Sequence, residues 1–142
     1  MAEADKLFAG NIPGFYDRFL VPLIFEPYAR DLSARVTSNN PKRVLEVAAR
    51  TGVVTRSLAS RLPANTELIV TDLNAPMIEH AKSRIGQYER IEWRTADAPN
   101  LPFENESFDA VACRFGAMFF PDKVRAFKES SSCAEADWPL LF

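Results

Sequence analysis

The sequence predicts a single α/β domain built on a doubly wound parallel sheet. Two observations predict it: from about residue 41 onward short apolar stretches alternate with amphipathic ones, and turn-forming residues separate them. Strand–helix–strand units with right-handed crossovers place their strands in parallel, with helices on both faces of the sheet. The length of 142 residues suffices for one hydrophobic core, and a hydrophobic share of 47% is ordinary for a globular domain.

The first 40 residues are predicted to be helical. One helix is expected over residues 26–36, because Pro27 suits a first helical turn and an apolar face follows at helical spacing. Tyr28, Leu32 and Val36 form that face and are predicted to be buried. Residues 39–41 (Asn-Asn-Pro) then break the pattern, so the helix is expected to end before them.

Strands and helices alternate in the remainder of the chain. Strands are predicted over residues 44–47, 68–72, 91–95 and 108–113. Helices are expected between the first three strands, one from about residue 53 to residue 61 and one after Asn74 with Pro76 in its first turn. Asn74 is predicted to cap the second of these helices, and its buried side is expected to carry Met77, Ile78, Ala81 and Ile85. This order of elements gives the parallel sheet its strands one to four.

Composition and charge exclude several classes of protein. Lys and Arg number 17 against 19 Asp and Glu, and a net charge of -2 leaves no basic surface for nucleic acid or anionic lipid. Apolar runs such as residues 20–25 are too short to span a bilayer, and the acidic N-terminus lacks a signal-peptide pattern. Cys113 and Cys133 have neither metal-ligand nor disulfide spacing. We therefore expect a cytoplasmic protein with no metal ion, no nucleic-acid partner and no membrane span.

Acidic residues follow three successive strands. Glu46, Asp72 and Asp97 stand at the ends of the first, second and third predicted strands. Ligands of such sheets bind beyond the carboxyl ends of the strands, where a carboxylate after the second strand suits both hydroxyls of a ribose. Asp97 could accept a hydrogen bond from an exocyclic amine such as adenine N6. Each acid alone has a structural alternative, Asp72 as support for the next helix and Asp97 as a turn residue, but three in succession favour a ligand site.

The turn after the first strand reads Glu-Val-Ala-Ala-Arg-Thr-Gly over residues 46–52. Small residues let a ligand approach the backbone, and the following helix N-terminus favours a negative group. A dinucleotide-binding turn needs glycine where this chain has Ala48 and Arg50, and Glu46 would repel a pyrophosphate. A nicotinamide or nucleotide-sugar enzyme is therefore disfavoured. The alternative is a plain strand-to-helix turn in which Gly52 faces a helix.

Three segments together carry a resemblance to a known family. The segments VLEVAARTGVVTRSLASRLP, VTDLNAPMIEHA and IEWRTADAPNLPFENESFDAVACRFGAMFFPDK stand in the order and spacing of class I, S-adenosylmethionine-dependent methyltransferases of the ubiquinone/menaquinone-biosynthesis type. The chain resembles this family over about residues 5–129. The resemblance implies a Rossmann-like fold, S-adenosylmethionine as cofactor, and methyl transfer to a small-molecule acceptor.

The resemblance also implies where the methionine end of the cofactor would bind. Glu46 and the turn from Ala48 to Gly52 would hold that end. Arg114, directly after the fourth strand, would lie near it and near the mouth of the acceptor site. Tyr16 resembles a lid residue that covers the cofactor.

The nucleoside end is implied to bind at the next two strand ends. Asp72 would bind the ribose hydroxyls, with Leu73 against the adenine ring. Asp97 and the backbone amide of Ala98 would contact the adenine edge. Methyl transfer from a sulfonium is an in-line displacement for which orientation matters most and a general base is optional, so no catalytic residue is assigned.

The chain departs from the family pattern at Arg50, which stands where the middle glycine of the turn is expected. Ala48 replaces the first glycine, a milder change. An arginine at this position could occupy the cofactor's amino-acid pocket or strain a backbone with positive φ. Alternatively, it could point outward or pair with the methionine carboxylate.

The end of the chain is the second departure. A last helix is expected to begin near Asp122 and to turn Val124 and Phe127 inward. We assign residues 1–129 to the methyltransferase domain, with N-terminal helices over 1–40 and the cofactor-binding core over 41–129. Residues 130–142 read as a divergent tail without a strand pattern, so strands five to seven are expected to be missing.

Two expectations follow from that missing part. The fourth strand would be an exposed edge through which chains could self-associate, because its backbone groups would lack partners. The alternative to methyl transfer is a truncated, catalytically inactive module that binds the cofactor or another protein.

Overall fold

The computed structural model describes residues 18, 26–38, 40–85, 90–113, 122–134 and 140–141. Their strands form one sheet in the order β3-β2-β1-β4-β5, and every neighbouring pair is parallel. The strands are β1 (Arg43–Glu46), β2 (Glu67–Asp72), β3 (Ile91–Thr95), β4 (Ala110–Ala112) and β5 (Leu140–Leu141). The order reverses at β1, and a reversal of this kind is where ligands of parallel sheets bind.

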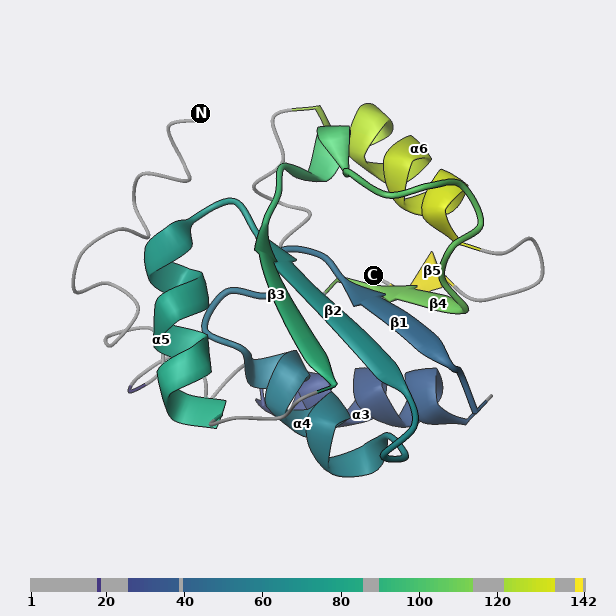
Figure 1. The fold of residues 1–142 in the computed structure, drawn as a ribbon. Helices are drawn as coiled ribbons and strands as arrows, with labels where there is room; N and C mark the ends of the chain where they lie inside the picture. The colour runs from purple at the N-terminus through teal and green to yellow at the C-terminus, as the bar shows by residue number, and fades with distance from the viewer. Residues whose placement is uncertain are drawn as a thin grey trace.

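Helices cover both faces of this sheet (Figure 1), which confirms the doubly wound, Rossmann-like α/β fold. The helices are α3 (Glu26–Thr37), α4 (Val53–Arg61), α5 (Ala75–Ile85) and α6 (Lys123–Cys133), and a short 3₁₀ helix, η2, spans Ala98–Asn100. In Figure 1, α3 and α4 lie on one face and α6 on the other. No helix within these described ranges is both long and apolar enough to cross a bilayer.

The core consists of two apolar layers, one on each face of the sheet. Successive residues of a strand point to opposite faces, so Val44 of β1 joins the layer under α3 and α4 while Leu45 joins the layer under α6. The first layer includes Leu32, Val36, Leu58, Leu68 and Val70, and the second includes Ile69, Phe108, Val111, Ala126 and Cys133. Because both faces are covered, the middle residues of the central strands are apolar on both sides, Val44 and Leu45 in β1 and residues 68–70 in β2.

Most predicted elements are confirmed within a residue at each end. Helix α4 and strand β3 have the predicted bounds, and Asn74 directly precedes α5 as expected. Strand β4 is shorter than predicted, because Phe108 forms only an isolated parallel bridge with Ala134. Phe108 is fully buried, and its ring packs edge-on against Phe103 at 5.1 Å.

The predicted inner face of α3 is wrong at one position. Tyr28 is 50% exposed, whereas the buried stripe runs through Ala29, Leu32, Ser33 and Val36. The stripe can include a serine because the Ser33 hydroxyl donates to the Ala29 carbonyl at 2.8 Å. A buried serine with a backbone partner is not visible as an apolar position in the sequence.

The predicted inner face of α6 is also wrong. Val124 is 65% exposed and Phe127 is 38% exposed, while Ala126, Ser130 and Cys133 are buried. The start near Asp122 is confirmed, since its carboxylate accepts the Arg125 N–H at 3.0 Å and caps the helix. Small residues on the buried face let α6 lie close to the sheet, and this outweighs the larger hydrophobic surface on the other side.

The tail contributes to the fold, contrary to the prediction that it contains no strand. Helix α6 continues to Cys133, and Leu140–Leu141 forms β5 beside β4. Its two residues pair with Val111 and Ala112, so β4 lies inside the sheet (Figure 1). The expected exposure of the fourth strand is therefore corrected, and with it the reason for self-association through that strand. Two residues are too few to show a period-two pattern in a sequence.

Candidate functional site

The turn that joins β1 to α4 (residues 47–52) has an unusual backbone. Ala48, Arg50 and Gly52 all have positive φ, at 56°, 58° and 84°. Hydrogen bonds tie the turn to both neighbouring strands, since Val47 N–H donates to the Ala112 carbonyl at 2.8 Å and Ala49 N–H to the Thr71 carbonyl at 2.9 Å. The turn is thus held in position at the carboxyl end of β1.

Gly52 is required here for two reasons. Its φ of 84° lies in the region that other residues rarely adopt, and a Cβ atom would come within 2.9 Å of Ile85 Cδ1 and 3.0 Å of Ala81 Cβ. Helix α5 therefore packs directly against this glycine. The alternative of a helix-facing glycine is confirmed as a packing role, while a contact of Gly52 with a cofactor stays a prediction.

Arg50 occupies the left-handed region without being glycine, and a non-glycine residue there costs roughly 1–2 kcal/mol. Its residue is only 5% exposed, which excludes the interpretation that the side chain points outward into solvent. Backbone strain at this position, one of the consequences considered from the sequence, is confirmed. Surrounding contacts must stabilise the conformation, and one of them is made by the backbone itself, since Arg50 N–H donates to Asp72 Oδ2 at 2.9 Å.

Asp72 connects the turn to the next helix. While Oδ2 accepts from Arg50, Oδ1 accepts the Asn74 N–H at 2.9 Å, and the residue is only 2% exposed. The supporting role considered for Asp72 is therefore real. A carboxylate oxygen can accept more than one hydrogen bond, so a supporting role and a ligand role are chemically compatible.

Glu46 is buried beneath the turn at 2% exposure. The Thr55 hydroxyl donates to its carboxyl group, and the Thr71 hydroxyl donates to its backbone carbonyl at 2.9 Å. Burial raises the pKa of Glu46 to about 8, the Thr55 hydrogen bond opposes the rise, and the charge of Asp72 adds to it. Glu46 is therefore mostly protonated at neutral pH, so its repulsion of a pyrophosphate is weaker than the sequence suggested.

The third strand end is more open. Asp97 is half-buried, directly before η2, and its side chain makes no capping hydrogen bond. Ala98 is buried, and Leu73 is half-buried beyond the end of β2. Because Ala96 N–H donates to the Asp72 carbonyl at 3.0 Å, the segment that carries Asp97 lies alongside the end of β2.

The structure thus brings together seven of the nine predicted site residues at one edge of the sheet: Glu46, Ala48, Gly52, Asp72, Leu73, Asp97 and Ala98. Tyr16 and Arg114 lie outside the described residues.

The sequence reasoning missed four polar residues at this edge. Thr55 and Thr71 hold Glu46, as described above. Within the described part of the chain, Thr51 Oγ1 and Asn74 Nδ2 are buried with no hydrogen-bond partner. Unpartnered buried polar atoms are rare in folded proteins, so two beside one turn indicate room for a polar ligand group. The sequence did contain a signal for two of them, since Thr51 and Asn74 carry polar side chains shortly after the first and second strands.

Comparison with known proteins agrees with this geometry. Demethylmenaquinone methyltransferase of Deinococcus radiodurans is 31% identical over 128 residues, which cover 88% of this chain and 53% of that protein. A ubiquinone/menaquinone biosynthesis C-methyltransferase of Citrifermentans bemidjiense is 30% identical over 98% of this chain and 62% of its own length. The chain thus spans little more than half the length of these curated relatives.

A solved structure extends the agreement to the fold. A protein from Methanococcus maripaludis assigned as an S-adenosyl-L-methionine-dependent methyltransferase superposes with a TM-score of 0.81. The alignment covers 99% of this chain and 66% of that one at 19% identity, which supports the fold alone. Residues 44–136 match the family described as a methyltransferase domain. The strand order, the β1–α4 turn with its strand-end acids and this match together show that the chain belongs to the methyltransferase domain family, in its class I, S-adenosylmethionine-dependent form.

Proposed function

We propose that this chain binds S-adenosylmethionine along the carboxyl ends of β1, β2 and β3 and takes part in methyl transfer to a quinone-type small molecule. The observation that carries the proposal is the β1–α4 turn, whose three left-handed residues bring backbone N–H groups to the sheet edge between Glu46 and Asp72. Family membership supports the cofactor. The chain covers only part of its relatives, so activity and acceptor are both parts of the proposal.

The residues present fit the cofactor. Asp72, at the carboxyl end of β2 and held by the Arg50 and Asn74 N–H groups, would accept the ribose hydroxyls. Asp97, whose carboxylate has no capping partner, would accept the adenine amine, with the Ala98 amide and Leu73 beside the ring. Thr51 Oγ1 and Asn74 Nδ2 are available to polar cofactor atoms. A bound sulfonium cofactor supplies the electrophilic methyl group.

The protein contributes by orienting the cofactor and by excluding water from the site. Glu46 is mostly neutral at physiological pH, so the turn keeps a hydrogen-bonding carboxyl group near the methionine end without a full negative charge. The apolar layers beneath the sheet edge exclude water from below. In-line displacement from an oriented sulfonium needs little more than this, and no general base is assigned.

The relatives suggest the acceptor. Both are named for methylation in menaquinone or ubiquinone biosynthesis, and we carry that acceptor class to this chain. We also propose a reducing, cytoplasmic setting, which the free thiol of Cys133 supports. Burial raises the pKa of Cys133 to about 11, so this thiol is not a nucleophile at neutral pH.

A calorimetric titration of the purified chain with S-adenosylmethionine and with NAD tests the cofactor. We expect saturable binding of S-adenosylmethionine at one site and none of NAD, and the reverse result would overturn the assignment. Transfer of a labelled methyl group to a demethylated menaquinone then tests the acceptor. A chain that binds the cofactor and methylates no quinone would be an inactive cofactor-binding module, the alternative considered from the sequence.

A further inference from the structure

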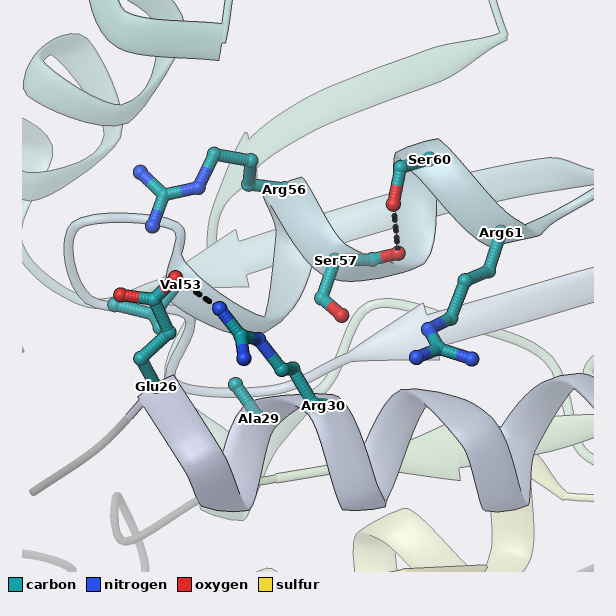
Figure 2. Close-up of a pocket in the computed structure, with 8 residues that line it drawn as sticks. All are labelled: Glu26, Ala29, Arg30, Val53, Arg56, Ser57, Ser60 and Arg61. Carbon is teal, nitrogen blue, oxygen red and sulfur yellow. Dashed lines mark hydrogen bonds and ion pairs between the residues drawn. The ribbon is translucent and has the colours of Figure 1, made fainter. Parts of the chain in front are cut away.

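A groove lies between α3 and α4, and it begins at Val53, the first residue of α4, directly after the β1–α4 turn. Figure 2 shows it, with residues of α3 along one wall and residues of α4 along the other. Its volume is about 240 Å³. The lining residues are Glu26, Ala29, Arg30, Val53, Arg56, Ser57, Ser60 and Arg61.

The α4 wall is one continuous helical stripe. Val53, Arg56, Ser57, Ser60 and Arg61 follow the spacing i, i+3, i+4, i+7, i+8 that places residues on a single face. The apolar face of α4, with Leu58 fully buried, points instead toward the sheet. On the face of α4 that lines the groove, every residue except Val53 is polar or cationic, so the groove does not suit an apolar partner.

Positive charge dominates the groove. Three arginines line it against a single glutamate, in a chain whose net charge is -2. On α3 each arginine is matched by an acid one turn earlier, Arg30 by Glu26 at 3.2 Å and Arg35 by Asp31 at 3.0 Å. Helix α4 contains no acidic residue, and among the described residues neither Arg56 nor Arg61 has an ion-pair partner.

The guanidinium groups are the donors available to a ligand. Ser57 and Ser33 share a hydrogen bond between their hydroxyls at 2.5 Å, and the Ser60 hydroxyl donates to the Ser57 carbonyl at 2.8 Å. The serine protons are therefore used within the helices. In Figure 2 Arg61 reaches from the end of α4 toward α3, and Arg30 reaches from α3 toward the start of α4. Since Arg30 is paired with Glu26, an occupant would be held mainly by charge-assisted hydrogen bonds from the α4 wall.

We propose that this groove is a binding site for a phosphate-bearing anion, with Arg56 and Arg61 as its principal donors. Arginine presents several N–H donors in a planar fork that matches phosphate oxygens. A volume of about 240 Å³ lies below the roughly 300–1,000 Å³ of pockets for larger organic ligands and suits a small group such as phosphate or pyrophosphate. The groove is lined by none of the residues assigned to the cofactor, so this proposal does not rest on the proposed function.

Phosphate can come from a soluble ester or from a lipid headgroup, and two probes distinguish them. Inorganic pyrophosphate is titrated into the full chain by calorimetry at constant ionic strength. Vesicles of phosphatidylcholine with and without phosphatidic acid are tested by flotation. We expect Arg56→Gln and Arg61→Gln each to weaken binding about tenfold or more, since each removes charge-assisted hydrogen bonds to the anion.

Two controls make the result specific. Ser60→Ala alters the same groove without touching a guanidinium, and Arg35→Gln removes the same charge from α3 outside the groove. Both should bind like the wild type. All four positions are exposed or half-exposed, so the variants are expected to fold, and melting curves verify this. Pyrophosphate binding that needs both arginines supports a soluble ligand, and vesicle binding alone that needs them supports a lipid.

The proposal is overturned by either of two results. One is the absence of saturable binding with both probes. The other is binding that Arg35→Gln weakens as much as Arg56→Gln and Arg61→Gln do, because it would then reflect overall charge and not this groove.

Discussion

Asp72 accepts two backbone N–H groups, from Arg50 and Asn74, and in the proposed complex it also accepts the ribose hydroxyls. We expect Asp72→Ala to weaken S-adenosylmethionine binding by about 1–3 kcal/mol in calorimetry, because the hydroxyls lose their acceptor. The melting temperature should fall too, because two buried N–H groups lose theirs. Asp72→Asn keeps the size and one acceptor oxygen, so both losses should be smaller. Unchanged affinity in a folded Asp72→Ala protein would exclude the ribose role.

Arg50 is a second residue at which stability and binding can be separated. Arg50→Gly removes the positive-φ penalty of roughly 1–2 kcal/mol and clears the place where the family pattern expects glycine. We expect a higher melting temperature and tighter S-adenosylmethionine binding. Arg50→Ala is the control, since it removes the side chain and keeps the strained backbone. Weaker binding by both variants would show instead that Arg50 pairs with the methionine carboxylate.

Glu46 gives the fold a pH dependence. Burial raises the pKa of Glu46 from 4.5 to about 8, so between these values the folded protein holds a proton that the unfolded chain has released. The free energy of unfolding contributed by this group therefore falls as pH rises through the window and levels off above it. Glu46→Gln mimics the protonated group and removes the titration. Urea denaturation across the window should show the free energy of unfolding of the wild type falling relative to that of Glu46→Gln as pH rises, and a constant difference would contradict the raised pKa.

At the residue scale the sequence located the site better than it explained it. The acids Glu46, Asp72 and Asp97 were identified because each directly follows a recognisable strand. Their partners were not, because a hydrogen bond such as that from Thr55 to Glu46 depends on how the first turn of a helix lies against a strand. The double use of Asp72 also depends on the φ angles of the turn, and sequence spacing does not contain them.

Helix α4 ends at a cap supplied from far along the chain. The Arg90 guanidinium donates to the carbonyls of Leu62, at 2.7 Å, and of Ala59 and Pro63. The Ala59 carbonyl lacks a helical partner because residue 63 is a proline, so Arg90→Ala should lower the free energy of unfolding by about 1–2 kcal/mol in urea denaturation. Arg90→Lys should restore part of it. A loss no larger than that of the surface control Arg35→Ala would show that the cap contributes nothing.

At the element scale, hydrophobic periodicity and turn-forming residues were sufficient to predict most helix and strand bounds. The bounds of helix α4 and strand β3 were predicted correctly, because in each the pattern of apolar residues stops at turn-forming residues. The buried face of a helix was harder to predict where the buried residues are small. In α6 the larger Val124 and Phe127 face outward and Ala126 and Ser130 face inward, so hydrophobic size pointed to the wrong face.

For the whole molecule, the closing strand is the feature to test. Strand β5 pairs with Val111 and Ala112 of β4, so we expect the full chain to sediment as a monomer and to melt cooperatively. A variant that ends at Ala134 lacks β5 and leaves the backbone groups of β4 unpaired on that side. That variant should melt at a lower temperature and self-associate in sedimentation. Equal behaviour of the two chains would show that β5 contributes nothing to the sheet.

The anchoring of the β1–α4 turn has a consequence for the thermodynamics of binding. Hydrogen bonds from Val47, Ala49 and Arg50 to the ends of β4 and β2 fix the backbone of the turn in the folded chain without a ligand. The conformational entropy of these residues, roughly 1–2 kcal/mol each at room temperature, is therefore lost on folding and not on binding. A ligand that enters this turn meets a preorganised surface, and more of its contact energy remains as affinity.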